Sequence, residues 1–204
     1  GNGCDVPGNP GWCRGTQTAG FTATDATSGL APSGDPSIDF SENTGTNGTA
    51  VLINSGTKTD LAGNVADAID AGPFKIDSVK PVISLRPAGD SCSLPGNSGW
   101  CRGTQTAGFK ADDATSGFDP SGDLATNFTR SSSTNGSAVQ INSGTQTDRA
   151  CNVADAVDAG PYMIDSVAPA IADLGPTPAL PNGNNGWYTT AVSNAFEASD
   201  ATSG

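Results

Sequence analysis

The feature that most constrains this chain is a long segment that occurs twice. Residues 11–29 read GWCRGTQTAGFTATDATSG, and residues 99–117 read GWCRGTQTAGFKADDATSG. A looser third copy, GWYTTAVSNAFEASDATSG, occupies residues 186–204. Because each copy of a repeat must form the same local structure, a fixed period limits the fold more strongly than composition does.

The repeat has a period of about 88 residues. Trp12 maps to Trp100 at this offset, and the Ile-Asp-Ser-Val segment at 76–79 maps to 164–167. The third copy, at Trp187, follows after 87 residues. We therefore predict three domains, at residues 1–79 (lacking its first strand), 80–167 (complete) and 168–204 (the start of a third). Since both ends fall inside a predicted domain, we expect the sequence to be part of a longer array.

Alternation along the repeat indicates strands with one buried face. Phe21 and Ala23 are kept in the third copy as Phe196 and Ala198, whereas the residues between them change, which is a period of two. With 27 Gly and 14 Pro the chain is rich in turn residues, and no segment has a sustained helical period. We expect strands at 19–24, 50–53, 55–59, 72–76 and 82–85. The prediction is an all-β fold, with each unit a β-sandwich of roughly seven short strands.

Three motifs recur in a fixed order, and they carry a resemblance to a known family. After the GW segment with its DATSG turn come DLAGNVA at 60–66 and KIDSVKP at 75–81. This order resembles the tandem immunoglobulin-like repeats of prokaryotic surface proteins and adhesins. The resemblance implies tandem immunoglobulin-like β-sandwich domains with proline-containing joints. One departure is Cys151, which stands where the first copy has Gly63.

Four of the five cysteines follow the repeat. Cys4 and Cys13 map to Cys92 and Cys101, and the third copy has neither cysteine. Paired presence and paired absence predict two local disulfides, Cys4–Cys13 and Cys92–Cys101, and hence an extracellular or cell-surface location. Metal ligation by these pairs is the alternative, but the chain has no His to complete such a site. Cys151 is left over, either as a small side chain at a glycine position or as a free or intermolecular thiol.

Aspartates also recur with the repeat. The equivalent sets are Asp25/Asp113/Asp200, Asp60/Asp148, Asp67/Asp155, Asp70/Asp158 and Asp77/Asp165. Carboxylates gathered at a domain joint suit Ca²⁺, which takes six to eight oxygen ligands, so Asp77 and Asp165 are candidate calcium ligands. The alternative is that these aspartates shape turns through bonds to the backbone and keep the surface soluble.

The three tryptophans occupy one position of the repeat. Trp12, Trp100 and Trp187 each follow a glycine just before the first long strand. We expect them to close one end of each sandwich as structural plugs. A row of exposed indoles that stack on sugars is the alternative.

Three Asn-x-Ser/Thr sequons offer glycosylation sites at Asn47, Asn127 and Asn135. The first and last are equivalent by the repeat. Because both are Asn-Gly pairs, their recurrence is also explained by hairpin turns.

Charge and residue usage exclude several functions. A net charge of −12 disfavours nucleic acid as a partner. No apolar run is long enough to cross a bilayer, so we expect no membrane insertion. Without His, and with no defensible catalytic constellation, we expect no enzyme.

These inferences converge on a structural or adhesive segment of a long extracellular surface protein, in which the repeats form a fibre, a filament or an adhesin stalk. Its partners are then neighbouring copies of the same protein or other surface components. The alternative is a non-catalytic spacer, or a set of carbohydrate-binding repeats, in a secreted multidomain enzyme.

Overall fold

A computed structural model of the chain describes residues 2–9 and 11–204. Within these ranges the fold is all-β, and the only other regular elements are two 3₁₀ turns, η1 (Pro87–Gly89) and η2 (Asn184–Gly186). None of the helical segments in the described part could cross a membrane. The chain forms two compact units: unit 1 holds residues 1–85, 109–128 and 143–157, and unit 2 holds 86–108, 129–142 and 158–204.

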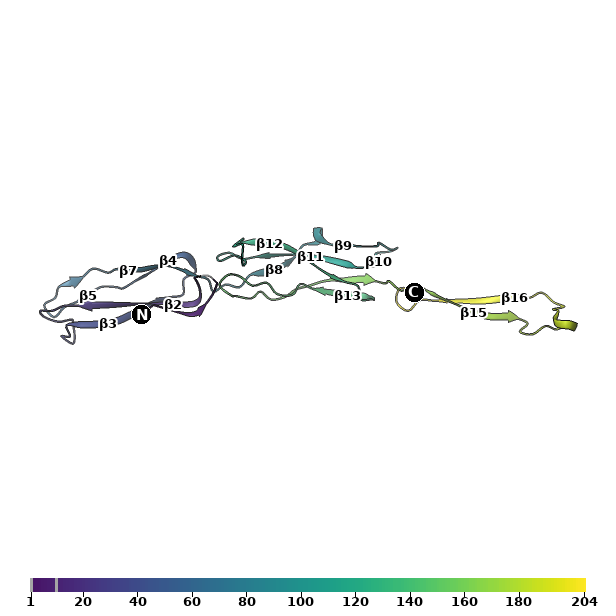
Figure 1. Cartoon of the computed structure of the whole chain (residues 1–204), viewed down its shortest axis with the longest axis horizontal. Helices are drawn as coiled ribbons and strands as arrows, with labels where there is room; N and C mark the ends of the chain where they lie inside the picture. Colours follow the sequence, from purple (N-terminus) through teal and green to yellow (C-terminus); the bar gives the residue numbers. More distant parts are fainter. Residues whose placement is uncertain (1, 10) are drawn as a thin grey trace. The chain divides into compact units, whose positions relative to one another are not determined.

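The first copy of the repeat forms a two-layered β structure in unit 1. Its strands are β1 (Gly3–Pro7), β2 (Trp12–Thr24), β3 (Ser37–Thr44), β4 (Gly48–Asn54), β5 (Lys58–Thr59), β6 (Val65–Ala66) and β7 (Asp70–Ile76). Strand β2 is shared: its first residues pair parallel with the end of β7, and its remainder pairs antiparallel with β1 and β3. Strands β4 and β7 pair antiparallel in the other layer (Figure 1).

The core of unit 1 confirms the predicted alternation. Along β2, Ala19 and Phe21 are buried whereas Thr22 between Phe21 and Ala23 is exposed. The buried face packs against apolar side chains from the other strands, namely Phe40, Ile53, Ala71 and Phe74. Phe21 stacks on Phe40 with ring centroids 5.6 Å apart. One face of each strand thus supplies a single apolar core between the two layers, which β2 connects into one hydrogen-bonded sheet.

The second copy forms most of these elements again 88 residues further on. Its strands are β8 (Val82–Leu85), β9 (Ser91–Cys92), β10 (Trp100–Cys101), β11 (Gln105–Asp112), β12 (Ala125–Ser132), β13 (Gly136–Asn142) and β14 (Asp158–Ile164). Strand β8 is additional, β10 and β11 together correspond to β2, and β5 and β6 have no counterpart among the described strands. The pairing registers agree as well: Ile53 lies opposite Ala71 in the first copy, and Ile141 lies opposite Ala159 in the second. The repeat in the sequence is therefore a repeat of strand register.

The compact units do not follow the period of the sequence. Residues 109–128 and 143–157 come from the second copy, yet they belong to unit 1 together with the whole first copy. Two segments of the second copy, one of which includes parts of β11 and β12, therefore form one compact unit with the first copy.

The third copy behaves differently. Its strands β15 (Ala170–Thr177) and β16 (Ser193–Ser199) form an antiparallel two-stranded sheet. Phe196 and Ala198 are both exposed, Phe196 by 65%. The expectation that they line a buried inner face is wrong here, because β16 pairs only with β15 and no second sheet covers it among the described residues.

Candidate metal centre

Three buried carboxylates meet in unit 1. Asp77, Asp113 and Asp148 each place an oxygen within 4.8 Å of the other two. Their exposed fractions are only 0%, 5% and 1%. Buried carboxylates are normally paired with a cation or neutralised, so the physical reason for this cluster has to be sought in its contacts.

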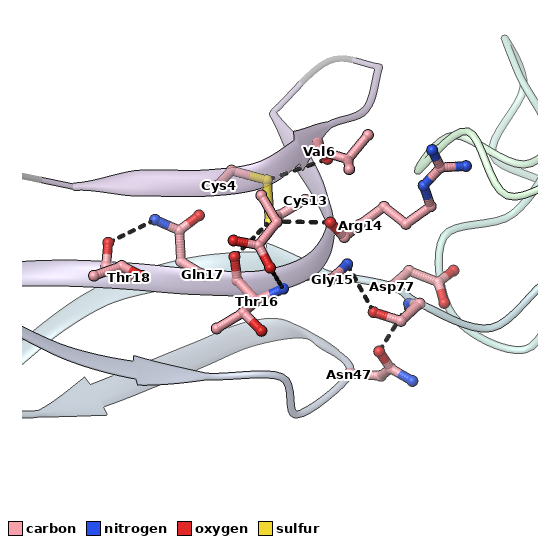
Figure 2. Close-up of a disulfide and its surroundings, with 12 residues drawn as sticks. Cys4, Val6, Cys13, Arg14, Gly15, Thr16, Gln17, Thr18, Asn47 and Asp77 are labelled. Carbon is pink, nitrogen blue, oxygen red and sulfur yellow. Dashed lines mark hydrogen bonds between the residues drawn. A yellow bond between two sulfur atoms is a disulfide. The ribbon is translucent and has the colours of Figure 1, made fainter.

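Asp77 is positioned by the end of the first copy. It follows Ile76, the last residue of β7, and its backbone N–H donates to the carbonyl oxygen of Cys13 at 2.9 Å. Its Oδ1 accepts the N–H of Val79 at 3.0 Å, and its Oδ2 accepts the N–H of Ser116 at 3.0 Å. In Figure 2 the Asp77 carboxylate points away from the neighbouring disulfide. The backbone of the second copy's loop therefore reaches this carboxylate directly.

Asp113 begins the DATSG turn of the second copy, directly after β11. Its Oδ1 accepts the N–H groups of Thr115 at 3.1 Å and Gly117 at 2.6 Å. Asp25, its equivalent in the first copy, holds the same turn through its own Oδ1. The turn-shaping role predicted as an alternative is therefore present. However, Oδ2 of Asp113 is buried and has no hydrogen-bond partner in the described part of the chain, so turn formation does not account for the whole carboxylate.

Asp148 is held by Asn152, which also ties the two copies together. Oδ1 of Asp148 accepts the Asn152 N–H at 2.8 Å, and Oδ2 accepts the Asn152 side-chain amide at 2.8 Å. The same amide donates to the carbonyl oxygen of Asp77 at 3.0 Å. Burial raises the pKa of Asp148, and the negative charges of Asp77 and Asp113 raise it further, against the lowering effect of the Asn152 hydrogen bonds.

A second orphaned oxygen belongs to a residue that contacts the cluster. Ser116, whose N–H donates to Asp77, is 3% exposed, and its Oγ is buried without a hydrogen-bond partner among the described residues. The ion pairs Lys80–Asp155 and Lys110–Asp112 involve carboxylates outside the centre. The donor atoms gathered here are therefore all oxygens, which is the set that hard divalent cations prefer.

The two aspartates predicted from the sequence have different surroundings. Asp77 belongs to the centre, and Asp165 repeats its local geometry in unit 2: its N–H donates to the carbonyl oxygen of Cys101 at 2.9 Å, and its Oδ1 accepts the Val167 N–H at 3.0 Å. Asp165 and Asp200 line one pocket of unit 2. The printed sequence contains no third-copy counterpart of Asp148.

Sequence reasoning noted that Asp113 and Asp148 recur but did not place them with Asp77, and it missed Ser116 and Asn152. No short spacing links these residues, since they come from three separate segments of two copies. The recurrence of every carboxylate of the centre at the repeat period was the one available signal.

Both predicted disulfides are present. Cys4 bonds to Cys13 and Cys92 bonds to Cys101, each pair with Cα atoms 5.6 Å apart (Figure 2). They indicate an oxidising environment, as in extracellular proteins. Cys151 is free among the described residues and partly buried. Whether it bonds to another chain stays a prediction.

The tryptophans do not share one environment. Trp12 is buried, with 6% exposed, as expected for a structural plug. Trp100 is half-buried, and Trp187 is 73% exposed. The plug therefore fits the first copy and fails for the third.

Two of the sequon asparagines each bind a backbone N–H group of a residue far along the chain. Oδ1 of Asn47 accepts the Ser78 N–H at 2.9 Å (Figure 2), and Oδ1 of Asn135 accepts the Ser166 N–H at 3.0 Å. Asn127 lies exposed on β12. The Asn-Gly pairs do not form the expected hairpins, because the strands on either side of each pair, β3 and β4 or β12 and β13, do not pair with each other among the described residues. Glycosylation stays a prediction.

The fold and the site together define a disulfide-stapled all-β protein with a buried cluster of carboxylates. No family model, no curated protein and no solved structure matches this chain.

Proposed function

We propose that the chain is a structural or adhesive segment of an extracellular surface protein, built from tandem immunoglobulin-like repeats that give length to a fibre, a filament or an adhesin stalk. Its partners in this proposal are neighbouring copies of the same protein or other surface components. It catalyses no reaction.

The observation that carries the proposal is the repetition of strand register at the period of the sequence. Trp12 lies opposite Lys75 and Trp100 lies opposite Met163, both in parallel pairs at the same place in the repeat. Repeating one folded unit in series is how proteins build extended scaffolds. The two disulfides support an extracellular place for such a scaffold, since they persist in oxidising compartments.

The carbohydrate-binding alternative is weakened by the burial of Trp12. A stacking platform needs an accessible indole face, and a row of them would need every copy to expose its tryptophan. The spacer alternative remains distinct, because a spacer needs the same repeats but leaves activity to another module.

The test is to locate the chain on the source cells. Antibodies raised against the 204-residue chain are applied to intact and to permeabilised cells, and bound antibody is located by gold labelling in the electron microscope. We expect labelling of intact cells along extended surface structures. Labelling only after permeabilisation would contradict the proposal. Labelling of tethers that carry globular enzymatic heads would replace it with the spacer alternative.

A further inference from the structure

We propose that Asp77, Asp113 and Asp148 bind one calcium ion, with the Oγ of Ser116 as a further ligand. The proposal concerns unit 1 alone, since all four residues belong to it. It does not rest on the proposed function.

The first argument is the pair of orphaned oxygens. Oδ2 of Asp113 cannot turn away to find a partner, because Oδ1 of the same carboxylate is held by two backbone N–H groups. Oγ of Ser116 is a separate, uncharged group, and its residue is fixed beside Asp77 by a backbone hydrogen bond. Buried polar atoms are nearly always satisfied. Two unsatisfied oxygens, one in the cluster and one in a residue that is hydrogen-bonded to it, therefore point to a missing electron-pair acceptor.

The second argument is charge. Three carboxylates within 4.8 Å of one another in a buried place repel strongly, because water does not screen them. A divalent cation at their centre converts this repulsion into attraction. Lys80 and Lys110 stand close in sequence to Asp77 and Asp113, but their ion pairs are with Asp155 and Asp112.

The donor set selects calcium among common cations. All available donors are oxygens, which disfavours zinc and other metals that prefer nitrogen and sulfur. Mg²⁺ holds several of its waters and seldom enters an all-protein cage, whereas Ca²⁺ accepts six to eight oxygens in flexible geometry. Three carboxylates that can each bind through one or two oxygens, together with one hydroxyl, fit Ca²⁺.

The position of the site gives the ion a structural role. Asp77 closes β7 of the first copy, whereas Asp113 and Asp148 stand in two loops of the second copy. A bound ion therefore joins three chain segments that are distant in sequence, in addition to the hydrogen bonds from Ser116 and Asn152. Removing it should loosen the packing of these loops on the first copy.

The repeat also predicts the stoichiometry. Asp25 and Asp60 are the first-copy equivalents of Asp113 and Asp148, but the chain has no counterpart of Asp77 before them. Asp165 and Asp200, in unit 2, have no counterpart of Asp148. Each of these pairs offers two carboxylates instead of three. We therefore expect one tight calcium site in the 204-residue chain.

The experiment is calorimetric titration of Ca²⁺ into the chelator-treated full chain with its disulfides intact. We expect one site per chain with a Kd of about 10⁻³ M or tighter, since extracellular calcium modules bind at about 10⁻⁴ to 10⁻³ M. The variant D113N should weaken binding at least about tenfold, because it removes one charge and the free oxygen from the centre. The matched control is D25N, which changes the equivalent turn in the first copy and should bind Ca²⁺ as the unchanged chain does.

Thermal unfolding separates lost binding from lost folding. In Ca²⁺-free buffer D113N should melt no lower than the unchanged chain, since Asn keeps the turn acceptor and one repelling charge is gone. Added Ca²⁺ should then raise the melting temperature of the unchanged chain and of D25N, and raise that of D113N clearly less at the same Ca²⁺ concentration. If D113N does not fold, S116A serves instead, since it removes only the hydroxyl; it should weaken Ca²⁺ binding and keep the Ca²⁺-free melting temperature.

The proposal is overturned if the chain binds no Ca²⁺ at millimolar concentration, or if D113N and D25N weaken binding equally. An equal response to Mg²⁺ would overturn the assignment to calcium.

Discussion

At the scale of single residues, the backbone at Cys151 shows what the departure from the repeat does. Cys151 has a φ of +68°, and Gly63, its equivalent in the first copy, has a φ of +90°. This region of backbone conformation is strained for residues with a Cβ and free of strain for Gly. Cys151 therefore stands in a turn whose positive φ glycine adopts without strain.

We expect C151G to stabilise the chain by about 0.5–1 kcal/mol. The change relieves backbone strain in the folded state, and the greater conformational entropy of Gly in the unfolded chain offsets part of that gain. The matched change G63A should destabilise the first copy by about 1–2 kcal/mol. A Cβ at Gly63 meets no atom within 4 Å, so this loss comes from backbone strain alone. Calorimetric unfolding of both variants measures the changes, and equal signs for the two would contradict the argument.

Tyr162 offers a second prediction at this scale. Its O–H donates to Oδ2 of Asp90 at 2.9 Å, and burial together with this bond raises the pKa of Tyr162 to about 12 from a usual 10.0. Because the raised pKa belongs to the folded state, the resulting stability is present below pH 10 and is lost as the pH rises through about 12. We expect D90N to move the tyrosinate absorbance titration of Tyr162 back toward its usual pKa. The variant Y188F removes the other tyrosine and should leave the shifted titration in place.

At the scale of strands, burial on one face decides which positions matter. Phe109 of β11 is fully buried and stacks on Phe128 with ring centroids 5.5 Å apart. Phe196, which occupies the equivalent position in β16, is 65% exposed. The same residue type at the same place in the repeat therefore has very different contributions to stability.

We expect F109A to cost about 3–5 kcal/mol, because it removes a buried aromatic side chain and leaves a cavity. The change F196A should shift the free energy of unfolding by no more than about 0.5 kcal/mol, as for ordinary surface substitutions. Urea denaturation of the two variants measures both values. A large loss in F196A would show that Phe196 is buried against something in solution.

Strand positions could be predicted from sequence wherever the residues of one strand face differ between copies and those of the other face are kept. Val82–Leu85 forms β8 as expected, and alternation located the interior of β2. The pattern could not show that β2 begins as early as Trp12, because its first residues are fixed by pairing with β7 and β1. The expected strand at 55–59 shrinks to Lys58–Thr59, which pairs only with Val65–Ala66. Local alternation does not predict the ends of a strand where pairing with strands distant in sequence determines them.

At the scale of the whole molecule, the chain has more acidic than basic residues, and several of its carboxylates accept hydrogen bonds within turns. Backbone N–H groups lower the pKa of Asp25 and Asp200, and the side-chain amide of Asn64 lowers the pKa of Asp60. The pKa of these carboxyl groups is lower in the folded state than the usual 3.8. They therefore stabilise the fold at pH values above 3.8, and this stabilisation is lost as the pH falls below 3.8 through the folded-state pKa. Acid should therefore unfold the chain through its turns.

We expect the melting temperature in Ca²⁺-free buffer to fall as the pH drops below about 4. The triple variant D25N/D60N/D200N keeps an acceptor oxygen at each turn but has no charge to lose there. Its melting temperature should fall less steeply over the same range. An identical slope for variant and unchanged chain would mean that other groups control acid unfolding.

The candidate metal centre was predictable only in part, and the reason also lies at this scale. Asp77 could be recognised because it stands near a predicted joint. Asp113 and Asp148 come from loops that the fold of a second copy brings to the same place, so their meeting depends on how two copies pack. A sequence repeat states that each copy folds alike, but it does not state which loops of one copy meet the next.

The local disulfides have a consequence for how such a chain reaches its fold. Neighbouring copies share almost the same segment, so during folding an edge strand such as β1 could pair with the wrong copy's long strand, the usual hazard of repeated sequences. Cys4 and Cys13, like Cys92 and Cys101, are only nine residues apart, and each bond joins an edge strand to the strand that follows it. A bridge that closes within one copy ties each edge strand to a strand of its own copy. The disulfides therefore protect the order of the array against exchange between near-identical neighbours.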